Sequence, residues 1–260
     1  MFPVLCDLDG VVWLANRPID GSVDAIARLR AAGHRVLFVT NNSSAEVAVQ
    51  EAALAAIGVP AEGDVLTSAQ AAALLVAPGE RAIACAGAGV VEALRRQGAI
   101  VLDAGDPAAG DGADAVVVGW HRTFDYERLT RATTALLRGA RLVGTNDDAT
   151  YPTPDGPIPG GGSILAAVAT ASGVAPTIAG KPYEPMAALV RRTVGDDAAR
   201  RAVMVGDRPS TDGRFARLLG CRYAHVQSGV TPAGAVVEPT PDIEVTDLAA
   251  VADVLLAAEG

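Results

Sequence analysis

The stretch Phe2-Pro-Val-Leu-Cys-Asp-Leu-Asp-Gly-Val-Val12 decides the fold of this chain. An apolar run that ends at Cys6 is typical of a buried strand in a parallel sheet. Asp7 and Asp9 follow with one residue between them, so the strand pleat favours both acids on one side, and Gly10 allows a close turn. Two carboxylates at one point suit a divalent cation, or a nucleophile beside a proton donor. Alone, the pattern also fits a strand that ends in an ordinary acidic turn.

Three later segments repeat this arrangement of an apolar run followed by a polar cluster. They are Thr40-Asn41-Asn42-Ser43, then Gly180-Lys181-Pro182, then Gly206-Asp207 with Asp212. The first offers hydroxyl, amide and backbone donors at a helix start, which suits a phosphoryl group. The second supplies one cation and the third two carboxylates. Singly, each cluster also fits a solvated loop or a helix cap. Because the carboxyl ends of parallel strands form one crevice, we expect the clusters to meet.

Apolar runs and helix-like stretches alternate along the chain, which predicts an α/β protein with a doubly wound parallel sheet, a Rossmann-like arrangement. Helices are expected over 19–32 and 45–57, and a further strand and helix over 65–76. A second series of strands and helices separates the first two clusters from the last two. We therefore expect a core of residues 1–80 and 177–260, with strands at 177–179, 223–226 and 243–245, and an inserted α/β domain over 81–176.

Composition narrows the classes of function. The chain has 260 residues, of which 50% are hydrophobic and 4% aromatic, and a net charge of −9. That charge argues against a general nucleic-acid binder, whereas a bound cation together with Lys181 would still admit a phosphate. The cysteines Cys6, Cys85 and Cys221 lie in apolar surroundings, as expected for reduced core thiols in a cytoplasmic protein. No apolar stretch reaches about 18 residues, so no membrane span is expected.

Together, the four clusters resemble the four motifs of haloacid dehalogenase (HAD) superfamily phosphatases. The doubled asparagine after Thr40, the stretch Gly144-Thr-Asn-Asp-Asp148 and the stretch Pro159-Gly-Gly-Gly-Ser163 are similar to the NagD-like branch. That branch includes 4-nitrophenylphosphatases, phosphoglycolate phosphatases and glycerol-3-phosphate phosphatases. The resemblance covers essentially the whole chain. It implies a HAD core with a large α/β cap inserted between the second and third motifs, so that the block 81–176 is the expected cap.

The resemblance implies catalytic and metal-binding roles for the acids. Asp7 would be the nucleophile that forms an aspartyl phosphate, and Asp9 the general acid and base. Mg²⁺ would bind at Asp7, at the backbone carbonyl of Asp9 and at Asp207. Asp212 would support the metal through its waters.

The resemblance also implies contacts to the phosphoryl group. Thr40 and the backbone at Asn41 would hold its oxygens, and Lys181 would neutralise charge on the nucleophile and on the transferring group. From the residues alone, Lys181 could instead be a surface lysine, and Thr40 and Asp212 could be helix caps.

Substrate choice is expected to lie in the inserted block. Asn146, Asp148 and Tyr151 match the cap loop that faces the active site in the resembling enzymes. A tyrosine offers one hydroxyl and an apolar face, which fits a small polar phosphate ester, although Tyr151 also fits a packing turn. The last motif departs from the family, because Gly213 replaces an aliphatic residue and Pro209 precedes the second acid. We expect the departure to affect metal affinity more than reaction type.

These patterns predict a cytoplasmic, Mg²⁺-dependent phosphatase of a small phosphorylated metabolite, with glycerol 3-phosphate, phosphoglycolate and sugar phosphates as candidates. Two alternatives stay open. One is a phosphotransferase or mutase that passes the phosphoryl group from Asp7 to a second alcohol. The other is a non-catalytic sensor that is phosphorylated on Asp7. We expect neither nucleic acid nor membrane as a partner, and the cap could mediate a homodimer.

Overall fold

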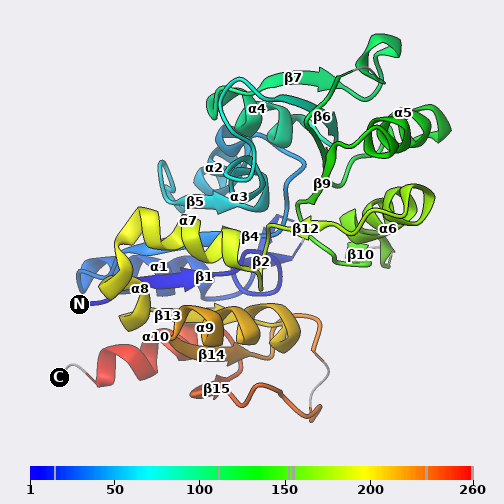
Figure 1. The fold of residues 1–260 in the computed structure, drawn as a ribbon. Helices are drawn as coiled ribbons and strands as arrows, with labels where there is room; N and C mark the ends of the chain where they lie inside the picture. The colour runs from blue at the N-terminus through cyan, green and yellow to red at the C-terminus, as the bar shows by residue number, and fades with distance from the viewer. Residues whose placement is uncertain (15, 111, 152, 154–155, 232–233, 259–260) are drawn as a thin grey trace. The chain divides into compact units, whose positions relative to one another are not determined.

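The computed structural model describes residues 1–14, 16–110, 112–151, 153, 156–231 and 234–258. It divides into two compact units (Figure 1). The first unit comprises Met1–Thr40, Ala48–Leu66 and Lys181–Gly260, and the second comprises Asn41–Val47 and Thr67–Gly180. The boundaries expected from the sequence, at 81 and 176, both fall inside the second unit.

The first unit is built on a six-stranded sheet. Strand β1 lies in its interior, and the strands that follow extend from it in two directions, which places the switch point between β1 and β13. Every residue of β1, β4 and β13 is buried, so helices cover both faces. The paired strands from β15 to β4 are parallel. In spatial order the strands are β15 (Ile243–Val245), β14 (Arg222–Val226), β13 (Val203–Gly206), β1 (Val4–Cys6), β4 (Val36–Thr40) and β5 (Val65–Thr67).

Two groups of helices pack on this sheet. Helix α1 packs on α10, and α7 packs on α8 and α9. In α1 the buried residues Ala25, Ile26 and Leu29 form one apolar stripe that faces the sheet. A short hairpin, not expected from the sequence, directly follows the first acids. The bounds are α1 (Ser22–Ala31), α2 (Val47–Ala56), α7 (Glu184–Val194), α8 (Asp196–Arg201), α9 (Arg214–Leu219) and α10 (Leu248–Ala257), with the hairpin β2 (Trp13–Leu14) and β3 (Arg17–Pro18).

The second unit has its own parallel sheet and its own apolar core. The core includes Ile83, Val116, Leu142 and Val168. Helix α3 packs on α4, and α5 packs on α6. In spatial order the strands are β12 (Thr177–Ile178), β9 (Arg141–Gly144), β8 (Ala115–Val118), β6 (Arg81–Cys85) and β7 (Ile100–Asp103). The helices are α3 (Ser68–Ala73), α4 (Ala88–Arg96), η1 (Pro107–Gly110), α5 (Tyr126–Leu137) and α6 (Gly161–Ser172), and a small hairpin joins β10 (Thr150–Tyr151) to β11 (Ile158–Pro159).

The strand expected at 177–179 belongs to the second sheet, which corrects its assignment to the core. Strand β12 pairs with β9, and the N–H of Ala179 donates to the carbonyl of Gly144 at 2.9 Å. Ile178 packs against the second core, which accounts for the pairing. After β12 the chain returns to the first unit at Lys181.

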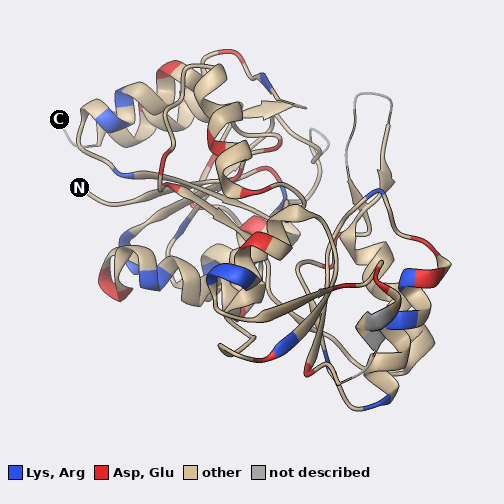
Figure 2. Ribbon diagram, turned by 90° about the horizontal axis from the view of Figure 1, so that it is seen from above, with Lys and Arg blue, Asp and Glu red and all other residues tan. Residues whose placement is uncertain are grey.

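Acidic and basic residues are mixed along the described part of the chain (Figure 2). In Figure 2, Lys and Arg residues of the described chain are spread over separate helices and loops, with Asp and Glu between them. Cys6, Cys85 and Cys221 are buried free thiols. Within the described ranges, no helix combines the length and the apolar character that a membrane crossing requires.

Candidate active site

The first two acids meet because β1 and β13 end side by side. Cys6 pairs with Val205, and the N–H of Asp7 donates to the carbonyl of Val205 at 2.9 Å. Asp7 follows β1 and Asp207 follows β13, so both lie at the carboxyl edge of the sheet, at its switch point. Gly10 has a φ of +85°, and a Cβ there would lie 2.7 Å from Cγ of Asp207. A glycine is therefore required for the turn that follows Asp9.

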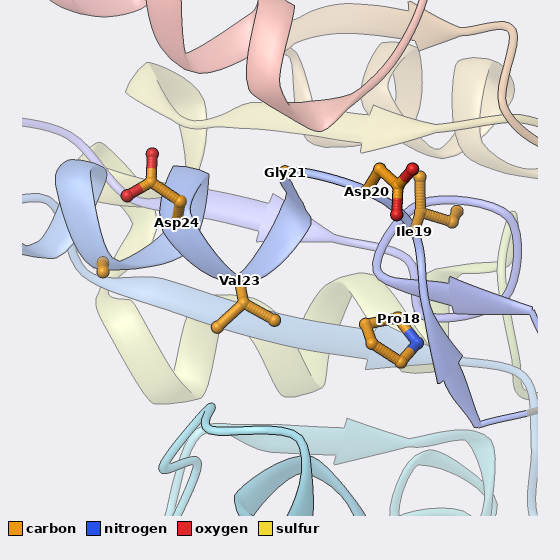
Figure 3. A pocket seen from close by; sticks show the side chains of 7 residues that line it. Pro18, Ile19, Asp20, Gly21, Val23 and Asp24 are labelled. Carbon is orange, nitrogen blue, oxygen red and sulfur yellow. The ribbon is translucent and has the colours of Figure 1, made fainter.

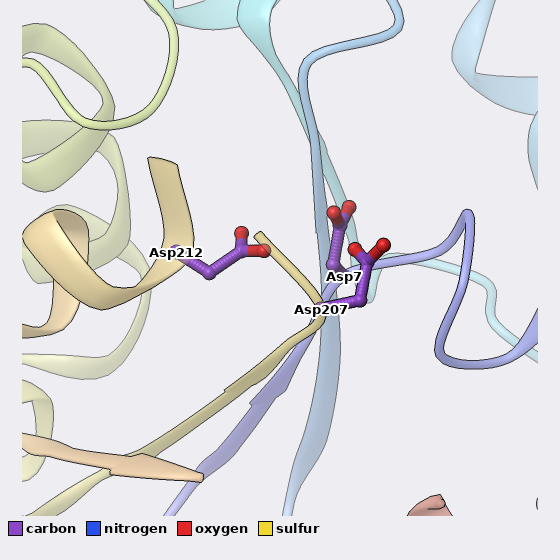
Figure 4. Close-up of side chains that lie close together, drawn as sticks. All are labelled: Asp7, Asp207 and Asp212. Carbon is purple, nitrogen blue, oxygen red and sulfur yellow. The ribbon is translucent and has the colours of Figure 1, made fainter. Parts of the chain in front are cut away.

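Asp212 completes a cluster of three carboxylates. One oxygen each from Asp7, Asp207 and Asp212 lie within 4.8 Å of one another. Figure 4 shows the carboxylate of Asp212 directed toward the other two. Two glycines make room for them, since a Cβ at Gly206 would lie 2.2 Å from Cβ of Asp212, and one at Gly229 would lie 2.0 Å from Oδ2 of Asp207. The absence of a Cβ at these two glycines thus leaves room for the side chains of Asp212 and Asp207.

Lys181 is the cation of this cluster. Its Nζ lies 3.0 Å from Oδ1 of Asp7 and 2.7 Å from Oδ1 of Asp212. The residue is 1% exposed, so the alternative of a surface lysine is wrong. Burial lowers the pKa of Lys181, but the adjacent carboxylates of Asp212 and Asp7 outweigh burial and hold that pKa above its usual value. The lysine therefore stays charged.

Burial and the charges of nearby carboxylates raise the pKa values of Asp9 and Asp207. Burial, followed by the charges of Asp7 and Asp207, raises the pKa of Asp9 to about 6. Burial and the charge of Asp7 likewise raise the pKa of Asp207 to about 6. Oδ2 of Asp207 accepts the N–H of Val230 at 2.7 Å, whereas its Oδ1 is buried and has no hydrogen-bond partner. A buried carboxylate oxygen without a donor, beside two further carboxylates, fits a divalent cation that takes oxygen ligands.

The turn that carries Asp212 contains the family departure. The turn spans Pro209–Gly213, and Oδ2 of Asp212 accepts the N–H of Arg208 at 3.1 Å. Gly213 has ordinary helical angles, and a Cβ there would lie 2.9 Å from Cε1 of Tyr223 and 3.0 Å from Cδ of Pro239. The two rings leave no room for an aliphatic side chain, so the glycine fits local packing.

The expected phosphate-binding residues lie at the end of β4. Cys6 pairs with Phe38, which places Thr40 beside the loop that follows β1. Thr40 is buried. The next backbone N–H after Thr40 is that of Asn41, which is the first residue of the second unit.

Asn146 and Tyr151 both lie in the second unit. Asn146 is 7% exposed; its Nδ2 donates to the carbonyl of Asn41 at 2.7 Å, and its Oδ1 has no hydrogen-bond partner. Tyr151 stacks on Trp120, with ring centroids 5.2 Å apart. Nε1 of Trp120 donates to the carbonyl of Pro159 at 3.0 Å, so this ring contacts both strands of the β10–β11 hairpin. The sequence analysis did not single out Trp120, which packs on Tyr151. Its position shortly after the buried strand β8 was the signal that could have indicated it.

The predicted residues therefore fall into two groups. The first unit holds Asp7, Asp9, Thr40, Lys181, Asp207 and Asp212, and the second holds Asn41, Asn146 and Tyr151. The histidines contribute to neither group: His34 and His121 each contact a backbone carbonyl, and His225 contacts a tyrosine hydroxyl.

A separate surface pocket lies at the start of α1 (Figure 3). Its wall includes Pro18, Ile19 and Val23, and it carries two acids, Asp20 and Asp24, whose side chains lie apart. The pocket lining contains no cation, so it does not suit a phosphate. The acid cluster with Lys181 remains the candidate active site.

Known proteins resemble this chain over most of its length. Residues 4–100 match the family model described as haloacid dehalogenase-like hydrolase, and residues 178–251 match a HAD-hydrolase-like model. A D-glycerol 3-phosphate phosphatase of Mycobacterium tuberculosis is 38% identical over 92% of this chain, which spans 66% of that relative's own length. An acid sugar phosphatase of Staphylococcus saprophyticus is 35% identical, and the match covers 87% of this chain and 86% of the length of that phosphatase. The crystal structure of a glycerol phosphate phosphatase from M. tuberculosis, in complex with magnesium, superposes with a TM-score of 0.84 at 34% identity, covering 95% of this chain and 74% of that one.

Proposed function

The chain belongs to the haloacid dehalogenase-like hydrolases, and we propose that it is a Mg²⁺-dependent phosphatase of small phosphorylated metabolites. The observation that supports this proposal is the cluster of Asp7, Asp207 and Asp212 at the carboxyl edge of the first sheet. Buried Lys181 forms ion pairs with two of these acids, Asp7 and Asp212. The relatives named above act on phosphate esters, and one of the similar structures contains magnesium.

Asp7, Asp207 and the backbone carbonyl of Asp9 are the proposed Mg²⁺ ligands, and Asp212 supports them. The unpartnered Oδ1 of Asp207 favours this set. A bound Mg²⁺ would offset the repulsion between the carboxylate nucleophile and the phosphate dianion.

Asp7 is the proposed nucleophile. Its carboxylate oxygen forms a bond to phosphorus while the ester P–O bond breaks, and the departing alcohol takes a proton from Asp9. Asp9 then accepts a proton from the water that attacks the aspartyl phosphate, which releases inorganic phosphate and restores Asp7. The pKa of Asp9, raised to about 6, suits both steps near neutral pH. Lys181, 3.0 Å from Asp7, stabilises negative charge on the nucleophile.

The substrate contacts are divided between the phosphoryl group and the alcohol. We assign the phosphoryl oxygens to the hydroxyl of Thr40 and the N–H of Asn41. On the alcohol side we assign Tyr151 and the unpartnered Oδ1 of Asn146. Glycerol 3-phosphate leads the candidates, followed by phosphoglycolate and sugar phosphates.

Phosphate release from 4-nitrophenyl phosphate tests the proposal. We expect turnover with Mg²⁺, none with EDTA, and none in the Asp7→Asn variant. Phosphorylation of Asp7 without turnover would support the sensor. Transfer to an added alcohol in place of phosphate release would support the phosphotransferase.

A panel of phosphate esters, ranked by kcat/KM, then tests the substrate class. Tyr151→Ala should reorder the panel more than it changes the rate on 4-nitrophenyl phosphate. An unchanged order would remove Tyr151 from the proposed substrate contacts. A homodimer through the second unit stays a prediction, which sedimentation equilibrium would test.

A further inference from the structure

The residue that follows Thr40 is held from three sides inside the second unit. The carbonyl of Asn41 accepts from Nδ2 of Asn146 at 2.7 Å and from Oγ of Ser68 at 2.7 Å. Its side-chain Nδ2 donates to Oδ2 of Asp148 at 3.0 Å. A carbonyl only accepts hydrogen bonds, so the amide orientation of Asn146 is fixed by its partner. Both the backbone and the side chain of Asn41 are therefore restrained.

Close packing leaves Asn41 little room to move. A Cβ at Gly180 would lie 2.4 Å from Oδ1 of Asn41, so the side chain rests directly on that glycine. Two residues further on, Oγ of Ser43 lies 2.9 Å from Oγ1 of Thr145. The loop 145–148 thus contacts the segment Asn41–Val47 at several points.

The segment Asn41–Val47 fills the place where open α/β sheets usually bind a ligand. The second sheet changes direction between β6 and β8, and its crevice lies at their carboxyl ends. A Cβ at Gly87 would lie 2.5 Å from the carbonyl oxygen of Ser44, and one at Gly119 would lie 2.8 Å from Oγ of Ser43. These glycines admit the backbone of Ser44 and the side chain of Ser43, so the crevice serves to anchor this segment.

We propose that Asn146, Asp148 and Ser68 are positioning residues, which fix the N–H of Asn41 for the phosphoryl group. This inference rests on the proposed function. It assigns to Nδ2 of Asn146 a role that does not depend on which alcohol the substrate carries. Loss of these contacts should weaken phosphate binding equally for every ester, because all esters share the phosphoryl group.

Inhibition by inorganic phosphate is the direct test, measured with 4-nitrophenyl phosphate as substrate. For Asp148→Ala we expect the phosphate Ki to rise about tenfold or more, and kcat/KM to fall by a similar factor across the ester panel. Asn146→Ala should raise the phosphate Ki by a similar factor and also reorder the panel, because it removes the Oδ1 assigned to the alcohol. Asp148→Asn keeps an acceptor oxygen and should recover most of the loss. The half-saturating Mg²⁺ concentration should stay within about twofold, since the metal ligands belong to the first unit.

Two further variants keep the test decisive. Ser68→Ala removes one contact to Asn41 with a small truncation, and should raise the phosphate Ki even if the Asn146 variant fails to fold. Ser163→Ala removes a comparable hydrogen bond, to the carbonyl of Ala149, without touching Asn41, and should leave Ki unchanged. A changed ester ranking at constant phosphate Ki would overturn the inference. Absence of turnover in the parent chain would instead overturn the proposed function.

Discussion

At the scale of single residues, the proposed chemistry depends on the different surroundings of Asp7 and Asp9. Asp7 has a lysine 3.0 Å away, whereas Asp9 is buried beside Asp7 and Asp207 and has its pKa raised to about 6. The proposed nucleophile thus has a cation beside it, while Asp9 can hold a proton near neutral pH. Two carboxylates two residues apart thus have different surroundings, as their proposed roles require.

Replacement of Asp9 by asparagine should separate the two chemical steps. Asp9→Asn keeps the shape but removes the proton donor and acceptor, so kcat should fall by about 10²–10⁴-fold. With 4-nitrophenyl phosphate, whose leaving group needs little protonation, the phosphorylated enzyme should accumulate. Mass spectrometry after an acid quench would detect one added phosphoryl group. An unchanged kcat would remove Asp9 from the mechanism.

The raised pKa values also predict an unusual dependence of stability on pH without metal. Asp9 and Asp207 titrate at about 6 in the folded chain, against an ordinary value of 3.8. Between these values the folded state binds more protons than the unfolded state, so the free energy of unfolding falls as pH rises from 4 to 6. A carboxyl whose pKa is higher by one in the folded than in the unfolded chain contributes about 1.4 kcal/mol to this change in the free energy of unfolding.

Urea unfolding in EDTA at pH 5 and pH 7 measures this effect. We expect the protein to be more stable at pH 5, and Asp207→Asn to reduce the difference. Saturating Mg²⁺ should also reduce it, because the metal stabilises the ionised carboxylates. An Asp207→Asn variant that loses as much stability between pH 5 and pH 7 as the parent chain would contradict the raised pKa of Asp207.

The sequence predicted the chemistry of single residues better than their surroundings. Asp7 and Asp207 follow neighbouring strands of one sheet, so the parallel-sheet rule was enough to expect them together. Lys181 follows β12 of the second sheet, so that rule does not account for its place beside Asp7. Nothing in the local pattern indicated that Asn41 would be held by Asn146, because that contact joins residues about a hundred positions apart.

At the scale of secondary-structure elements, the turn Pro209–Gly213 shows how packing decides a local departure from the family. Glycine is a poor helix former, so intrinsic propensity disfavours Gly213 at this helix start. Instead the glycine lets the rings of Tyr223 and Pro239 pack against the turn that carries Asp212. Intrinsic propensity was a poor guide here because tertiary contacts dominate.

Gly213→Ala should therefore destabilise the chain, even though alanine favours helices. The new Cβ would lie about 3 Å from both rings, and overpacking of this kind costs about 1–3 kcal/mol. Displacement of the turn should also weaken Mg²⁺ binding through Asp212. The exposed Ser210, in the same turn, provides the control variant Ser210→Ala. A stabilised Gly213→Ala variant would show that the rings yield and that propensity prevails.

Short strands were the elements that sequence patterns assigned least well. Strand β12 has only two residues, and its periodicity cannot tell which sheet it joins. Its partner is chosen by the contact of Ile178 with the second core, a tertiary property. The helices α1 and α2, by contrast, run close to the ranges 19–32 and 45–57 that the sequence predicted.

At the scale of the whole molecule, the proposed ligands of the metal are confined to one of two units that have separate sheets. Asp7, Asp9 and Asp207 all belong to the first unit, as do Lys181 and Asp212. Each unit buries its own core, so each can open locally with its own free energy. Mg²⁺ binding should therefore stabilise the first unit in preference to the second.

Hydrogen exchange with and without Mg²⁺ tests this expectation on the intact chain. At a free Mg²⁺ concentration of about 100 times Kd, linkage contributes about 2.7 kcal/mol, which slows exchange from opened states up to about a hundredfold. The slowing should appear in β1 and β13, which end at the metal ligands, and should be absent from β6 and β8. Asp207→Asn should abolish it. Equal slowing in both sheets would mean that the two units open together, and slowing confined to β6 and β8 would place the metal outside the acid cluster.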